Sequence, residues 1–144
     1  MPAIGPQTIT YSFYFTLDFA ETEENSDYVH NLNFVTRKYN VAASLDSYEE
    51  FLYNEKGQLI FYYQQLETVD NVLRARCYFL NNKLVKFSLK ELIEEGEIDN
   101  SADYKEIYNS IYNIPEIYFD EYISISSKSN QIKNLYHMID EVVQ

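Results

Sequence analysis

The 144-residue sequence is short of the residue types from which most catalytic and cofactor sites are built. It contains one cysteine, two histidines, three glycines and no tryptophan. A single cysteine excludes an internal disulfide framework and a cysteine-based zinc site, and the two histidines lack the spacing of paired metal ligands. Neither GxGxxG nor GxxxxGK[ST] occurs, so no glycine-rich phosphate loop is present. We therefore expect no cofactor and no metal.

Basic residues are also scarce. The chain has 11 lysines and arginines against 23 aspartates and glutamates, which gives a net charge of −12. Because duplex binding depends on cations that neutralise phosphates, we expect no nucleic-acid partner. Residues 90–144 are the more acidic part, with 12 acids and 4 bases. This acidity indicates either solubility alone or a surface that steers toward a basic partner.

Long apolar runs are absent as well. No stretch approaches the roughly 18–20 apolar residues that a membrane span needs, so no membrane span is expected. The start of the chain, Met1 to Pro6, has neither a basic segment nor an apolar one, and no signal peptide is visible. Two compartments stay open: the cytoplasm, or an exported protein whose numbering begins after a removed signal.

What the sequence does have is aromatic residues, 15 tyrosines and 9 phenylalanines, arranged in strand-like patterns. Residues 8–19 alternate apolar and polar side chains, which is typical of a strand with one buried face. A second strand is predicted over 32–41. Two hairpins follow, 48–53 with 58–66 and 72–80 with 83–89, which turn at 54–57 and at Asn81–Asn82.

After Ser88 the pattern changes toward helical spacing. Ser88 and Glu91 match a capping box, which predicts a short helix that ends near Gly96. A second helix is predicted from Ser101, and Pro115 is suited to open a third. The Ser-rich middle of that third helix, residues 124–130, could be a break, so the sequence leaves open whether 115–143 form one helix or two.

These elements predict an α+β protein. We expect an antiparallel meander sheet of five or six strands, followed by two or three C-terminal helices. The chain is predicted to be a single domain, 1–144, with a sheet part at 8–89 and a helical part at 90–143. Tyr14, Tyr62 and Tyr78 lie on the second parity of their strands, so part of a second sheet face is expected to be exposed.

The two hairpins carry a resemblance. The runs YEEFLYNEKGQLIFYY (48–63) and RCYFLNNKLVK (76–86) resemble the hairpin pattern of uncharacterised secreted or lipoprotein β-hairpin domains of gut bacteria. The similarity covers about 40 residues, and Asn82 stands where those domains often have glycine. The resemblance implies an extracytoplasmic location, periplasmic or at the cell surface, for a non-catalytic module, with no catalytic residues to carry over.

Candidates for chemistry are few. Cys77 shares its parity with Ala75 and Phe79 and is predicted to be a small core residue. His30 and His137 are predicted to lie at the surface or on a helix flank. Carboxylates are plentiful, and a hydrolase would need two of them to converge across a cleft; the candidates are Glu49, Glu50, Asp120 and Glu121. We do not predict an enzyme.

A basic and aromatic group gives the candidate binding site. Arg74 and Arg76 share a strand face with Tyr78, and a two-residue turn at Asn81–Asn82 would place Arg76 opposite Phe87 and Tyr78 opposite Val85. Arginine beside aromatic rings can bind a carboxylate or stack on a ring, although these arginines could equally pair with acids of the chain itself. The predicted binding residues are Arg74, Arg76, Tyr62 and Tyr78.

Three functions remain in competition. The leading one is a non-enzymatic interaction module, exported to the cell envelope, that binds a protein or glycan through an aromatic sheet face. The alternatives are an acidic immunity or inhibitor protein that neutralises a basic partner, and a hydrolase with paired carboxylates. The sequence predicts no particular ligand and no oligomeric state.

Overall fold

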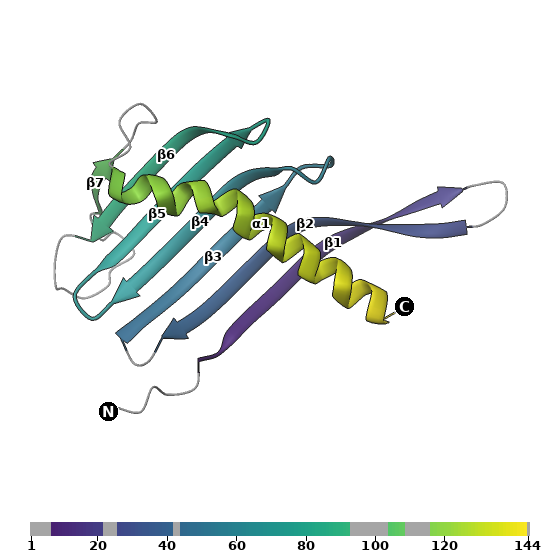
Figure 1. Cartoon of the computed structure of the whole chain (residues 1–144), viewed down its shortest axis with the longest axis horizontal. Helices are drawn as coiled ribbons and strands as arrows, with labels where there is room; N and C mark the ends of the chain where they lie inside the picture. Colours follow the sequence, from purple (N-terminus) through teal and green to yellow (C-terminus); the bar gives the residue numbers. More distant parts are fainter. Residues whose placement is uncertain (1–6, 22–25, 42–43, 93–103, 109–115, 144) are drawn as a thin grey trace.

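The computed structural model describes residues 7–21, 26–41, 44–92, 104–108 and 116–143. Seven strands form one antiparallel sheet in sequence order, and one long helix crosses it (Figure 1). The elements are β1 (Ile9–Glu21), β2 (Ser26–Val41), β3 (Leu45–Tyr53), β4 (Leu59–Thr68), β5 (Val72–Leu80), β6 (Lys83–Leu92), β7 (Tyr104–Tyr108) and α1 (Glu116–Val143). No helix among the described residues has the length and apolar character needed to cross a membrane.

The antiparallel meander and the α+β class are confirmed. Six strands lie within residues 9–92, in agreement with the predicted five or six, although β2 begins six residues before the predicted strand and β6 ends three residues after it. β7 adds a short strand at the edge. The two helices predicted before residue 115 are wrong in the described residues, since 88–92 complete β6 and 104–108 form β7. Strand structure therefore continues past residue 90, where the sequence predicts the helical part to begin. A spacing of four, as between Tyr104 and Tyr108, puts two residues on one face of a helix and also on one face of a strand.

The C-terminal segment forms a single helix rather than two or three. α1 continues through the Ser-rich stretch 124–130 because this stretch supplies part of its buried face. Ile125, Ser129, Ile132 and Tyr136 follow one another at helical spacing, and each is at most 6% exposed. One serine of the stretch in which the sequence allowed a break, Ser129, therefore packs against the sheet as part of a continuous helix.

The turns follow the predicted chemistry. Gly57 adopts a φ of 72° between β3 and β4, where a residue without Cβ is favoured, and its N–H donates to the Asn54 carbonyl over 2.9 Å. Asn81 and Asn82 have φ of 48° and 63°, as a type I′ turn requires at both central positions. Two tight hairpins therefore fix the order of the four central strands, β3 to β6.

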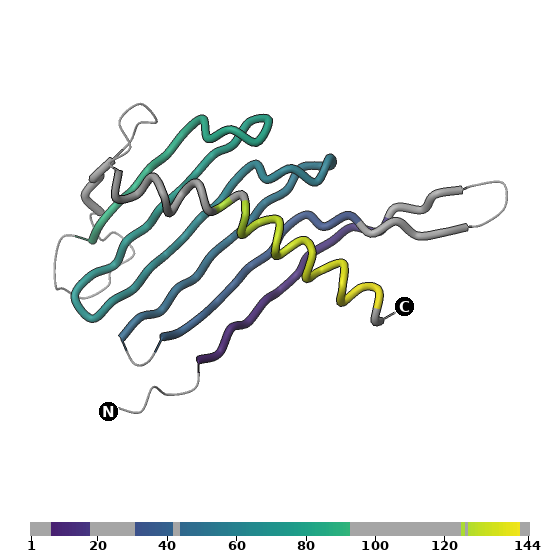
Figure 2. The backbone as a smooth tube through the Cα atoms, in the orientation of Figure 1, coloured from purple at the N-terminus to yellow at the C-terminus, as the bar shows by residue number. Residues whose placement is uncertain are grey.

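The core lies between the sheet and α1. One row of side chains crosses five adjacent strands in register: Val35, Phe51, Tyr62, Cys77 and Phe87, each at most 2% exposed. The predicted core position of Cys77 is confirmed. The later part of α1 crosses these strands diagonally, from the middle of the sheet toward β1 (Figure 2). The sheet thus has one face under the helix, and this covered face is distinct from the opposite, open face.

Candidate functional site

The open face is the side of the sheet opposite α1. The strand register aligns its side chains in rows that run across the strands. One row holds Tyr14, Phe34, Leu52, Phe61, Tyr78 and Lys86. The next holds Ser12, Thr36, Glu50, Tyr63, Arg76 and Ser88, and a third holds Thr10, Lys38, Tyr48, Gln65, Arg74 and Lys90. Aromatic and basic residues therefore lie side by side although they are scattered in the sequence.

The first of these rows is apolar across five strands. Tyr14 packs on Phe34 with ring centroids 5.5 Å apart, and Phe61 packs on Tyr78 at 5.1 Å. Tyr14 is 54% exposed and Tyr78 37%, so the two ends of the row are open to solvent. Rings held at such distances and angles support one another, which keeps their exposed surface in a fixed place. We call these five residues, Tyr14, Phe34, Leu52, Phe61 and Tyr78, the aromatic row.

Cations lie over several rings of the open face. The Arg76 guanidinium is 5.2 Å from the centroid of Tyr63, and the Lys86 ammonium is 5.6 Å from that of Tyr78. Lys38 lies over Tyr48 in the same way, also at 5.6 Å. Cation–π contacts hold a flexible side chain above the sheet while its charged end stays accessible. The face therefore presents positioned positive charge beside apolar surface.

The positive charge is concentrated on the β5–β6 hairpin. Five basic residues lie on its open side: Arg74, Arg76, Lys83, Lys86 and Lys90. The one acid of this hairpin, Glu91, lies on the covered side, where the Asn71 amide donates to it. Four of these cations form no ion pair with another described residue: Arg76, Lys83, Lys86 and Lys90. In a chain of net charge −12, this side of the hairpin is a basic surface.

Three of the four predicted binding residues share the open face, and one does not. Arg74, Arg76 and Tyr78 alternate along β5 on this side. Tyr62 lies on the covered face, where it is 2% exposed. The reason is a bulge in β4: Tyr53 pairs with Leu59 and Leu52 with Phe61, so Ile60 has no partner and the parity reverses. Its neighbour Tyr63 takes the place that the sequence assigned to Tyr62.

A second bulge corrects the predicted cross-strand pairs. The two-residue turn at Asn81–Asn82 is present, and Leu80 pairs with Lys83. The register then shifts between Tyr78 and Phe79, so that Tyr78 pairs with Lys86 and Arg76 with Ser88, rather than with Val85 and Phe87. Sequence reasoning therefore missed Lys86 as a neighbour of Tyr78. No local signal marks this bulge, since the extra residue, Val85, is of a type that also suits a regular strand.

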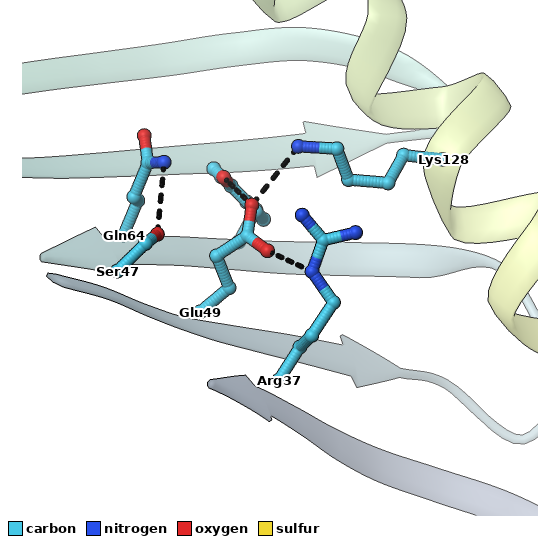
Figure 3. A network of polar contacts seen from close by, with 6 residues as sticks. Arg37, Ser47, Glu49, Gln64 and Lys128 are labelled. Carbon is cyan, nitrogen blue, oxygen red and sulfur yellow. Dashed lines mark hydrogen bonds and ion pairs between the residues drawn. The ribbon is translucent and has the colours of Figure 1, made fainter. Parts of the chain in front are cut away.

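The covered face holds a buried polar network around Glu49 (Figure 3). The Glu49 side chain is fully buried, and its Oε1 accepts hydrogen bonds from the Tyr62 hydroxyl at 2.7 Å and from Lys128 Nζ at 2.9 Å. Arg37 Nε lies 2.6 Å from Glu49 Oε2. Beside it, the Gln64 amide donates to Ser47. The network joins three strands to α1 and therefore fixes where the helix lies on the sheet.

Within this network, the Glu49 carboxylate affects the pKa of Arg37. Burial alone would lower the pKa of Arg37, but the Glu49 carboxylate beside it raises that pKa above its usual value. Next to this network, the Tyr53 hydroxyl of β3 donates to the Ser129 carbonyl of α1 and accepts a hydrogen bond from the Ser129 hydroxyl. Burial raises the pKa of Tyr53 to about 12. Lys133 donates to the Gly57 carbonyl at 2.9 Å. These contacts anchor the helix, and their polar groups face one another rather than solvent.

The carboxylates proposed for hydrolysis do not form a pair on β3. Glu49 is on the covered face, while Glu50 is on the open face and accepts a hydrogen bond from the Tyr48 hydroxyl at 2.8 Å. The side chains of Asp120, Glu121 and His30 lie outside the described residues; His137 is exposed on α1. Within the residues that the structure describes, no group of His, Cys, Asp and Glu could hold a metal ion.

One pocket of about 330 Å³ opens near the ends of β1 to β4. Its lining includes Lys38 and Tyr48 from the third open-face row, together with Asp46 and Glu67. Asn40 donates to Asp46 across the rim at 2.9 Å. The pocket lining therefore carries mixed charge, and it is continuous with the open face.

Comparison of the chain with family models, with curated proteins and with solved structures found no match.

Proposed function

We propose that this protein is a non-enzymatic interaction module that binds a partner protein through the open face of its sheet. The observation that carries the proposal is the juxtaposition of the aromatic row with the basic side of the β5–β6 hairpin. Tyrosine and arginine dominate the energetically important positions of protein interfaces because they combine a large contact area with a polar end.

The shape of the face suits an extended contact. Four spacings of about 4.8 Å between adjacent strands make the aromatic row about 19 Å long. The row runs across the strands of the sheet, and cations border it along β5 and β6. We infer that the partner presents acidic groups around an apolar centre. The location at the cell envelope, implied by the resemblance of the hairpins, belongs to the same proposal.

Substitution of single cations tests this function. Arg76→Gln and Lys86→Gln each remove a positive charge beside the aromatic row, and Lys56→Gln removes the same charge from the exposed β3–β4 turn. Poly-L-glutamate serves as a carboxylate-bearing polypeptide probe, and polygalacturonate as an acidic glycan probe. We expect poly-L-glutamate to bind the wild type and to lose at least about fivefold in affinity in the first two variants but not in Lys56→Gln.

Ionic strength gives a second readout. Added salt screens charges at the surface, so binding through these cations is expected to weaken as salt rises. Binding of polygalacturonate in preference to poly-L-glutamate would replace the protein partner with an acidic glycan. Equal binding by all three variants, or no binding of either probe, would overturn the proposal.

A further inference from the structure

The two edges of the sheet differ in how they are protected. β7 forms one edge; it is five residues long and includes Lys105 and Glu106. β1 forms the other edge, is 13 residues long, and pairs with β2 alone among the strands that the structure describes. The ten residues from 8 to 17 contain no charge, no proline and no glycine. Natural edge strands are normally short, charged or interrupted, because an unpaired edge invites another strand.

The edge at β1 also exposes apolar side chains on both sides of the strand. Ile9, Phe15 and Leu17 are 53%, 45% and 55% exposed, and Tyr14, on the open face, is 54% exposed. Phe15 faces the helix side, since its ring lies 6.0 Å from that of Tyr136. Leaving the apolar side chains of such an edge in water is unfavourable, and the backbone groups on its outer side can pair with another strand.

The end of α1 extends the same apolar surface. Tyr136 contacts Phe13 and Phe15 of β1, which places this part of the helix over the edge strand. Met138 and Ile139 follow in the next turn and are 64% and 45% exposed. Among the residues whose side chains the structure describes, ten large apolar ones are exposed, and six of these belong to β1 or to the end of α1. We call them the edge patch: Ile9, Tyr14, Phe15, Leu17, Met138 and Ile139.

We propose that a second copy of this chain covers the edge patch, by pairing of β1 with β1 across a two-fold axis. An isolated strand could satisfy the backbone of β1 but has no second layer to cover Met138 and Ile139. A second copy brings a strand and a helix in the same relative positions, so a two-fold axis places strand on strand and helix end beside helix end. This proposal does not rest on the function assigned to the open face, although the edge patch and the aromatic row share Tyr14.

The charge distribution favours this edge for self-association. Each copy carries a net charge of −12, so two copies repel each other over most of their surface. The uncharged stretch 8–17 is the part of the sheet edge where close approach brings the fewest like charges together. Salt screens the remaining repulsion, so the dimer is expected to become tighter as ionic strength rises. This salt dependence is opposite to the one expected for the open face.

Light scattering and sedimentation equilibrium across a range of concentrations test the dimer. We expect the wild type to reach twice the monomer mass and no more, with backbone amides of β1 protected from hydrogen exchange in the dimer. Leu17→Lys and Met138→Lys introduce charge into the patch from two different elements, and each should raise the dimer dissociation constant by about tenfold or more. Val69→Lys is the control, since Val69 is 80% exposed outside the patch.

Met138→Lys keeps the test valid if Leu17→Lys fails to fold, because Met138 lies on an exposed helix position. A protein that stays monomeric at every concentration would overturn the proposal and leave a foreign strand as the occupant of the edge. Growth beyond the dimer, or equal weakening by Val69→Lys, would also contradict it. Because none of these variants changes the basic side of β5–β6, loss of the dimer would leave poly-L-glutamate binding intact if both proposals hold.

Discussion

The two faces of the sheet use the same residue types for different purposes. On β3, Glu49 faces α1 and is enclosed by Arg37, Lys128 and Tyr62, whereas its neighbour Glu50 faces the open side and receives one hydrogen bond from Tyr48. Tyrosine, arginine and glutamate therefore occur on both faces. What separates the two faces is whether a second layer covers them, not their composition.

The largest expected difference in stability between the two faces concerns two adjacent glutamates, Glu49 on the covered face and Glu50 on the open face. Glu49→Gln removes the charge that compensates Arg37 and Lys128, and loss of one partner of a buried ion pair costs about 3–5 kcal/mol of unfolding free energy. Glu50→Gln is the matched control and should cost less than about 1 kcal/mol. Urea denaturation of both variants measures this. Equal losses would show that the buried network does not hold the helix.

Alkaline pH should destabilise the covered face through Tyr53. Burial raises the pKa of Tyr53 to about 12 from its ordinary value of 10. A group with a raised pKa in the folded state contributes stability below its unfolded pKa, and this contribution is lost as pH rises from about 10 to 12. A shift of this size corresponds to about 2–3 kcal/mol. Tyr53→Phe should unfold with a weaker pH dependence in this range, and an unchanged dependence would contradict the assignment.

A smaller difference in stability is expected between substitutions of Tyr62 and Tyr63, which are neighbours on β4. Tyr62→Phe removes the hydroxyl that donates to the buried Glu49 carboxylate, and such charge-assisted hydrogen bonds are worth about 2 kcal/mol. Tyr63→Phe removes a hydroxyl that donates to Gln65 at 3.2 Å on the open face, where water can replace it, and should cost less than about 1 kcal/mol. Thermal unfolding of the pair compares them. A larger loss of stability in Tyr63→Phe than in Tyr62→Phe would contradict the placement of Tyr62 on the covered face and Tyr63 on the open face.

The smallest effect on stability is expected for Arg76→Gln. Arg76 contacts the Tyr63 ring from the solvent side, so its loss should change the unfolding free energy by no more than about 0.5 kcal/mol. Its effect on binding should be larger than its effect on stability. A destabilisation comparable to that of Glu49→Gln would make Arg76 a structural residue and remove the main support for a recognition face.

Much of the sheet was predictable because its signals are local. Alternation located β1, and turn residues located the two central hairpins, with β5 predicted at its observed bounds. The region after Ser88 was not predictable in the same way. A capping-box pattern at Ser88 and Glu91 coincides there with a continuing strand, in which Phe87 and Leu89 stay on the covered face. Pairing with a neighbouring strand overrides such a local preference.

The candidate site was predictable along β5 but not across the sheet. Arg74, Arg76 and Tyr78 share a face by simple alternation, whereas bulges at Ile60 and Val85 changed the partners contributed by β4 and β6. A shift of one residue exchanges the two faces of a strand, which is why Tyr62 was assigned to the wrong side. The Glu49 network was also missed, because Lys128 reaches β3 from 79 residues further along the chain.

Tyrosine labelling in the presence of poly-L-glutamate tests the central claim, that the open face is the recognition surface, most directly. Tyr14 and Tyr78 are exposed on that face, while Tyr53 and Tyr62 are buried under α1. We predict that in the monomer the first two react readily without the probe and are protected when it is bound, and that the buried pair stays unreactive throughout. Binding of the probe with no protection of Tyr14 or Tyr78 would contradict the claim.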